Sequence, residues 1–268
     1  MNNKAIGIFD SGVGGLSCVK ELLCCLPGED IKYLGDTLRM PYGVKTIEEL
    51  REFAKNNVAF LQRRDVKLVA AACGTVSSNV AREDMDNLSV PFVDVIHPTV
   101  TAALYASKSR RIGIIATPAT VRAQSIENRL KAQDSRVQVI SVGCPSFVPL
   151  IEEGHIDDEE IIAAAREYLA PIKGFGVDVL ILGCTHYPII SSIIMNIMGD
   201  GVALVDSGKE TAFEIKRVLE SCDIACGKST GGSAEYFVTA RPDAFDGVAK
   251  IFLGEDERVH SQLTAIED

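Results

Sequence analysis

Two cysteines lie in closely similar local sequences, and their chemistry could support proton transfer. Cys73 closes the apolar run KLVAAACGT (67–75), and Cys184 closes DVLILGCTHYP (178–188). An apolar run followed by small polar residues is typical of a buried parallel strand, and ligands bind beyond the carboxyl ends of such strands. A single cysteine of this kind is most simply a small buried hydrophobe. The duplication instead predicts that both thiols face one shared site.

Two opposed thiols suit a reaction that exchanges a proton between two faces of one carbon. Racemisation without a cofactor removes a Cα proton on one side and returns a proton on the other, so it needs two acid–base groups. A thiolate is a base, and the thiol that it becomes is an acid. The carbanion-like transition state also needs hydrogen-bond donors in a pocket that excludes water.

Other polar residues lie near the predicted ends of the same strands. Asp10 and Ser11 follow the first apolar run in FDSGVGGL, where they could reach an ammonium group or a neighbouring thiol, and His186 is two residues beyond Cys184. A lone histidine is more often structural, but this one shares a loop with a candidate base. The GVGG segment also allows a phosphate-binding interpretation, although it lacks the P-loop lysine and the G-x-G-x-x-G spacing.

The composition excludes several classes of function. The 268 residues carry a net charge of −10 and no long Lys/Arg block, which argues against binding to nucleic acid. No signal peptide and no membrane span are predicted, so we expect a cytoplasmic protein. The eight cysteines include no C-x-x-C pair and are expected to be reduced. Cys222 and Cys226 have helical spacing but no paired histidine, and no metal site is predicted.

Alternation of strand-like and helical segments predicts an α/β fold with parallel sheets. The strand-like runs are 5–9, 31–34, 66–72, 92–96, 112–116, 137–142, 177–182 and 203–205. Thr46 with Glu49 forms a capping-box pattern, and Asp157 with Glu160 is expected to open another helix.

A weak internal repeat predicts two similar domains. IGIFDS (6–11) resembles IGIIAT (112–117), and a cysteine strand follows each after 60 to 70 residues. We therefore expect two doubly wound parallel-sheet domains related by a pseudo-twofold axis, with the site in the cleft between them. The first comprises 1–97 plus 207–268 and carries Cys73; the second comprises 98–206 and carries Cys184. AEYFVT (234–239) would rejoin the first domain.

Several motifs together give the chain a family resemblance over nearly its whole length. They are FDSGVGGL (9–16), GDTLRMPYG (35–43), AACGT (71–75), CPSFVPLIEEG (144–154), GCTHYP (183–188) and VDSG (205–208). The chain resembles the glutamate racemases of the aspartate/glutamate racemase superfamily. This resemblance implies interconversion of L- and D-glutamate without pyridoxal phosphate or a metal, and a supply of D-glutamate for peptidoglycan. We also expect a cytoplasmic homodimer whose partner is a small-molecule substrate, an amino acid, with no nucleic-acid or membrane partner.

The resemblance also assigns roles to individual residues. The implied catalytic residues are Cys73, Cys184, Asp10, His186 and Glu152. The implied substrate-binding residues are Asp10, Ser11, Pro41, Tyr42, Gly43, Gly74, Thr75, Thr185 and His186. Of the two implied bases, Cys184 would act on L-glutamate and Cys73 on D-glutamate.

One departure from the family pattern bears on the substrate. The family usually has Asn after the first cysteine, where this chain has Gly74, so an amide contact to substrate is missing. If glutamate is still preferred, Gly74→Asn is expected to improve kcat/KM. Three alternatives stay open: a racemase for another acidic amino acid such as aspartate, an amino-acid binding or regulatory protein with weak turnover, and a thiol redox protein.

Overall fold

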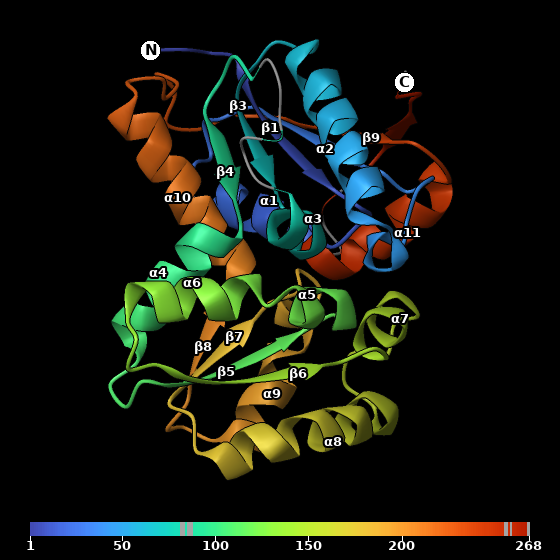
Figure 1. The fold of residues 1–268 in the computed structure, drawn as a ribbon. Coiled ribbons are helices and arrows are strands. Elements are labelled where there is room, and N and C mark those ends of the chain that lie inside the picture. The colour runs from blue at the N-terminus through green and yellow to red at the C-terminus, as the bar shows by residue number, and fades with distance from the viewer. Residues whose placement is uncertain (81–83, 85–87, 255–256, 258, 267–268) are drawn as a thin grey trace.

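The chain forms two parallel β-sheets that lie one above the other in Figure 1. This computed structural model describes residues 1–80, 84, 88–254, 257 and 259–266. The first sheet has the strand order β10-β9-β2-β1-β3-β4. Its strands are β1 (Ala5–Asp10), β2 (Ile31–Gly35), β3 (Val66–Ala71), β4 (Phe92–Asp94), β9 (Ala234–Val238) and β10 (Ser261–Leu263).

The second sheet repeats the plan of the first with four strands. Its order is β6-β5-β7-β8, from β5 (Arg111–Ala116), β6 (Gln138–Gly143), β7 (Val179–Leu182) and β8 (Ala203–Asp206). This matches the β2-β1-β3-β4 portion of the first sheet, and the similar sequences IGIFDS and IGIIAT form the equivalent inner strands β1 and β5. We call the first sheet with its helices the first lobe and the second sheet with its helices the second lobe. The α/β fold with two like parallel sheets is confirmed, while the predicted domain boundaries stay predictions.

Helices cover both faces of the sheets, as expected for doubly wound layers (Figure 1). They are α1 (Leu16–Cys25), α2 (Ile47–Gln62), α3 (Gly74–Asn79), α4 (Ile96–Ala106), α5 (Pro118–Ala123), α6 (Ser125–Gln133), α7 (Phe147–Glu152), α8 (Glu159–Phe175), α9 (Ser191–Met198), α10 (Ser207–Ser221) and α11 (Pro242–Leu253), with short 3-10 turns η1 (Tyr42–Val44) and η3 (Tyr187–Ile190). No helix in the described part of the chain is long and apolar enough to cross a membrane.

Strand β1 shows why these strands read as continuous apolar runs. Ile6 and Ile8 pack into the cluster that contains Leu16 of α1, whereas Phe9 packs into the cluster that contains Leu61 of α2. Both faces of the strand are buried, so alternation between apolar and polar residues is lost. The strand ends are then the positions left for polar side chains.

The predicted strands 92–96 and 177–182 are shorter in the structure. Strand β4 ends at Asp94 because the Asp94 carboxylate accepts hydrogen bonds from the backbone N–H groups of Ile96 and His97, at 2.7 and 2.9 Å, where α4 begins. Strand β7 begins only at Val179. The later segment AEYFVT rejoins the first sheet as β9, which pairs with β2, as predicted.

The observed starts of α2 and α8 can be compared with the N-caps predicted from the sequence. The Thr46 capping box is confirmed: the Thr46 hydroxyl accepts from Glu49 N–H at 3.2 Å, and Glu49 accepts from Thr46 N–H at 2.8 Å. The prediction that Asp157 opens α8 is wrong by one residue. Asp158 is the cap, and its carboxylate accepts from the N–H groups of Glu160 and Ile161, at 3.1 and 3.2 Å.

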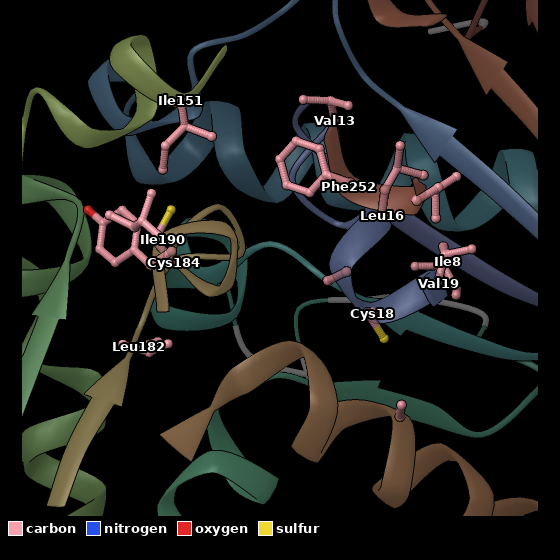
Figure 2. Packing of buried hydrophobic residues seen from close by; sticks show 14 of the residues in the cluster. Ile8, Val13, Leu16, Cys18, Val19, Ile151, Leu182, Cys184, Ile190 and Phe252 are labelled. Carbon is pink, nitrogen blue, oxygen red and sulfur yellow. The ribbon is translucent and has the colours of Figure 1, made fainter. Parts of the chain in front are cut away.

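The two lobes share one buried core. Figure 2 shows Ile151, Ile190 and Cys184 of the second lobe in the same cluster as Val13, Leu16 and Phe252 of the first. The ring of Phe252 on α11 meets the ring of His186 edge-on, with 5.3 Å between centroids. The loop that carries Cys184 is therefore packed directly against the first lobe.

Candidate active site

A cavity of about 410 Å³ opens between the lobes, and every residue predicted for the site lines it. These residues are Asp10, Ser11, Pro41, Tyr42, Gly43, Cys73, Gly74, Thr75, Glu152, Cys184, Thr185 and His186. The structure thus brings together all the positions singled out from the sequence. Their individual roles stay predictions.

Sheet topology places the two thiols in this cavity. Asp10 ends β1, Cys73 is two residues beyond β3, and Cys184 is two residues beyond β7. Each cysteine loop is tied to its own sheet by one further backbone bond: Ala72 N–H donates to Phe9 at 2.9 Å, and Gly183 N–H donates to Ile115 at 2.8 Å. The cleft walls are therefore extensions of the strands, as expected at the carboxyl ends of parallel sheets.

On the first wall, Cys73 shares a buried proton-binding pair with Asp10. The two residues are 4% and 2% exposed. Burial, followed by the neighbouring charge of Asp10, raises the pKa of the Cys73 thiol. Burial also raises the pKa of Asp10, although the positive His186 and the N–H of Gly15, at 2.7 Å, partly oppose it. Cys73 is therefore held as a thiol with a potential proton acceptor beside it.

On the second wall, Cys184 begins a chain of three side chains. His186 Nδ1 lies 3.8 Å from Cys184 Sγ, and its Nε2 lies 2.9 Å from Glu152 Oε1. Burial lowers the pKa of His186, but the hydrogen bonds to Cys184 and Glu152 outweigh it and raise this pKa to about 10. The Cys184 sulfur therefore lies within hydrogen-bond distance of an imidazole that carries a positive charge. The two thiols thus have different neighbours, a carboxyl group beside Cys73 and an imidazole beside Cys184.

The Tyr42 side chain has a structural task. Its hydroxyl donates to Asp36 and accepts from Asn57 Nδ2 at 3.1 Å, and Arg39 Nε binds the same Asp36 oxygen at 2.6 Å. Burial, reinforced by the charge of Asp36, raises the pKa of Tyr42, so it stays protonated. Because the Tyr42 hydroxyl is already hydrogen-bonded, the segment 41–43 can contribute its backbone groups to a ligand.

Two threonine side chains in the cavity have free hydrogen-bonding capacity. Thr75 and Thr185 are 7% and 5% exposed, and neither hydroxyl has a hydrogen-bond partner among the residues described. One comes from each wall, directly after the cysteine loop. They are available to a polar group of a bound substrate.

Sequence reasoning missed the contribution of the segment after β5. Thr117, Thr120 and Arg122 also line the cavity, together with Pro118 and Ala119. The internal repeat contained the signal, because Thr117 occupies the place in IGIIAT that Ser11 occupies in IGIFDS. Cys144 lines the cavity too, but burial raises its pKa to about 12, so it stays a thiol.

The structure also bears on the other cysteine interpretations. All eight cysteines are free thiols, and among the described residues no group of three or more His, Cys, Asp or Glu side chains is arranged to hold a metal ion. Cys222 follows the end of α10 at Ser221, so Cys222 and Cys226 do not share a helix.

Comparison with known proteins places the chain in a family. Residues 18–214 match the family model for Asp/Glu/hydantoin racemases. The chain belongs to this family. It is 42% identical to a glutamate racemase from Geobacter metallireducens over 94% of this chain and 93% of that protein.

Solved structures of family members superpose closely on the chain. A glutamate racemase isoform from Bacillus anthracis matches with a TM-score of 0.93 and 32% identity, covering 99% of each chain. A glutamate racemase from Francisella tularensis, solved with D-glutamate, matches with a TM-score of 0.89 and 32% identity, covering 100% of this chain and 99% of the other. An aspartate racemase from Picrophilus torridus, 18% identical with a TM-score of 0.56, shares the fold alone.

Proposed function

We propose that this racemase-family protein interconverts L- and D-glutamate by a two-thiol mechanism. The observation that carries the proposal is that the two thiols line one cavity and have different neighbours. Cys184 lies beside a histidine whose pKa is raised to about 10, while Cys73 is a buried thiol beside a carboxyl group. One side is arranged to accept a proton and the other to give one.

In the direction from L-glutamate, the Cys184 thiolate removes the Cα proton and becomes a thiol. The Cys73 thiol then gives its proton to the opposite face of the same carbon and becomes a thiolate, which completes inversion. To reset the site, the Cys184 thiol releases its proton to water and the Cys73 thiolate takes up a proton from water through the Asp10 carboxyl, so one proton leaves and one enters. The imidazolium of His186 keeps its charge and stabilises the restored Cys184 thiolate. No atom besides the Cα proton leaves the substrate.

Charge that develops on the substrate carboxylate needs hydrogen-bond donors in a dry pocket. The buried hydroxyls of Thr75 and Thr185 support this role, because neither has a partner among the described residues. Ser11 and the backbone of Tyr42 and Gly43 would bind the rest of the substrate. In this proposal Glu152 orients His186 and stabilises its positive charge, as the 2.9 Å contact supports.

Glutamate is favoured over aspartate because the relatives at 36–42% identity are glutamate racemases. We further propose that the product serves peptidoglycan synthesis in the cytoplasm and that the protein works as a homodimer. Light scattering of the purified protein tests the dimer. Depletion of the protein in its host, with D-glutamate added to the medium as rescue, tests the supply role.

Turnover in deuterated water tests the mechanism. We expect L-glutamate to give D-glutamate with one deuterium at Cα, because the acid on the far side carries a solvent-derived proton. Circular dichroism follows inversion, and mass spectrometry follows deuterium. Product that retains the substrate hydrogen would rule out two separate bases, and faster turnover of L-aspartate than of L-glutamate would move the substrate assignment to aspartate. Binding without any exchange would favour the regulatory alternative.

A further inference from the structure

Two glycines of the first lobe lie against the loop that carries Cys184. A Cβ atom built on Gly74 would lie 2.9 Å from the carbonyl oxygen of Gly183. A Cβ atom built on Gly14 would lie 2.3 Å from Thr185 Oγ1 and 2.5 Å from the His186 ring. A side chain at either position would therefore require the neighbouring atoms of the other lobe to shift.

The contact between Gly74 and Gly183 is next to both thiols. Gly74 directly follows Cys73, and Gly183 directly precedes Cys184. Gly74 is the first residue of α3 and does not have positive φ, so its backbone conformation does not require glycine. The close approach of the opposite wall is what excludes a side chain at this position.

Neither wall has room to retreat locally. Gly183 N–H is bonded to Ile115 at 2.8 Å, and a Cβ atom on Gly183 would lie 3.1 Å from both Ala116 Cβ and the Ile115 oxygen, so this residue already presses against β5. On the other wall, the Cys73 carbonyl accepts from Ser77 N–H at 2.9 Å within the first turn of α3. Added bulk at residue 74 must therefore move the lobes apart.

We propose that Gly74 is a positioning residue that sets the separation of the Cys73 and Cys184 thiols. The proposal rests on the two-thiol function proposed above. It reverses the expectation from sequence for Gly74→Asn: the Asn Cβ meets the Gly183 oxygen before its amide can serve the substrate. Glycine at this position lets the two walls approach more closely than they could with a side chain there.

The size of the effect follows from the distances. Ordinary contact begins at 3.4 Å, so a methyl group at residue 74 requires about 0.5 Å more space than the present 2.9 Å. A misplacement of about 1 Å between reacting groups can cost about 10²-fold in rate. We therefore expect Gly74→Ala to lower kcat about tenfold and Gly74→Asn to lower it further.

The experiment compares Gly74→Ala and Gly74→Asn with wild type in both directions of glutamate turnover. Gly174→Ala is the matched control, because it also adds one Cβ in a helix but meets nothing within 4 Å. We expect kcat to fall while KM changes less than about threefold, and the kinetic isotope effect with 2-deuterated glutamate to rise, because proton transfer becomes the slow step. The control should match wild type.

Crystal structures of wild type and Gly74→Ala provide a readout that needs no activity. We expect a larger distance between Cys73 Sγ and Cys184 Sγ in the variant, with each lobe unchanged. An unchanged separation, or an unchanged kcat and isotope effect, would overturn the proposal. So would a fall in activity that merely accompanies a loss of thermal stability. Wild type without racemase activity would refute the proposed function, while the crystal structures would still decide whether Gly74 sets the spacing.

Discussion

The two sulfur atoms of the cleft are chemically alike, and their neighbours make them different. Cys73 is buried beside a carboxyl group that disfavours its thiolate, and Cys184 lies beside an imidazole held positive by Glu152. In the proposed mechanism, this difference lets one thiol act as the base and the other as the acid at the same pH.

Substitution of either cysteine tests whether both thiols are needed, one as base and the other as acid. We expect Cys73→Ala and Cys184→Ala each to lower racemisation by about 10³-fold, because general acid–base groups typically contribute about 10² to 10⁴. Cys222→Ala, at an exposed position, is the control and should keep full activity. The measurement is the rate of inversion by circular dichroism, with far-ultraviolet spectra to verify the fold. Substantial turnover in either cleft variant would make that cysteine structural.

The raised pKa of His186 also predicts how stability changes with pH. In the folded protein this pKa is about 10, above its ordinary value of 6.5. The folded state therefore binds more protons than the unfolded state between these values, and the stabilisation is present below pH 6.5 and lost as the pH rises towards 10. We expect the difference in unfolding free energy between wild type and His186→Asn to shrink over this range.

Urea unfolding at about pH 6.5, 8 and 9.5, within the range between the two pKa values, measures this difference. His97→Asn is the control, because His97 is exposed and its side chain has no hydrogen-bond partner among the described residues. Its effect on stability should not vary with pH in the same way. A difference for His186→Asn that grows with pH would show that the histidine is neutral in the folded protein.

At the scale of the helices, two adjacent aspartates precede α8, and they differ in their hydrogen bonds to the helix start. Asp158 accepts hydrogen bonds from two backbone N–H groups, whereas Asp157 is exposed and accepts none from the residues that the structure describes. We expect Asp158→Ala to lower the melting temperature by about 2–4 °C, the usual result of losing an N-cap in a protein of this size. Asp157→Ala is the matched control and should melt as wild type does. An equal fall in both would show that charge near the helix start matters more than the cap.

The elements that sequence predicts best are those with one dominant signal. The inner strands β1, β3, β5 and β7 are buried on both faces, so their apolar runs are unmistakable. Because parallel strands end at the same edge, the polar residues that follow them could be assigned to one site. The Asp158 cap was misplaced because two adjacent aspartates satisfy the same pattern.

Packing between distant segments left no signal in the sequence. In α1, Cys18 is fully buried whereas Cys24 near the helix end is exposed, because the helix presents one face to the sheet. The approach of Gly74 to Gly183 joins residues more than a hundred positions apart. Such a contact depends on how the two folded lobes pack against each other, and no local sequence pattern predicts it.

At the scale of the whole molecule, the cleft lies between two copies of one strand plan. The β2-β1-β3-β4 and β6-β5-β7-β8 orders place equivalent strand ends on opposite walls. A repeat of this kind provides two similar loops facing one another, which suits a substrate that must be reached from two sides. The shared core through Ile151, Cys184 and Phe252 keeps the lobes in contact when the cleft is closed.

Opening of this cleft should control access to both thiols together. Cys73 and Cys184 are 4% and 7% exposed, so a maleimide can reach them only when the lobes separate. We expect the exposed Cys24 and Cys222 to be labelled first, the two cleft thiols more slowly, and the fully buried Cys18 last. Mass spectrometry of digested protein measures each rate.

Glutamate bound between the walls should slow labelling of both cleft thiols by the same factor, because one closure covers both. Cys24 and Cys222 serve as internal controls, since their rates should not respond to the ligand. Protection of Cys184 without protection of Cys73 would mean that the ligand occupies one wall alone. In that case a single base would face the substrate, and inversion would require a proton donor other than the second thiol.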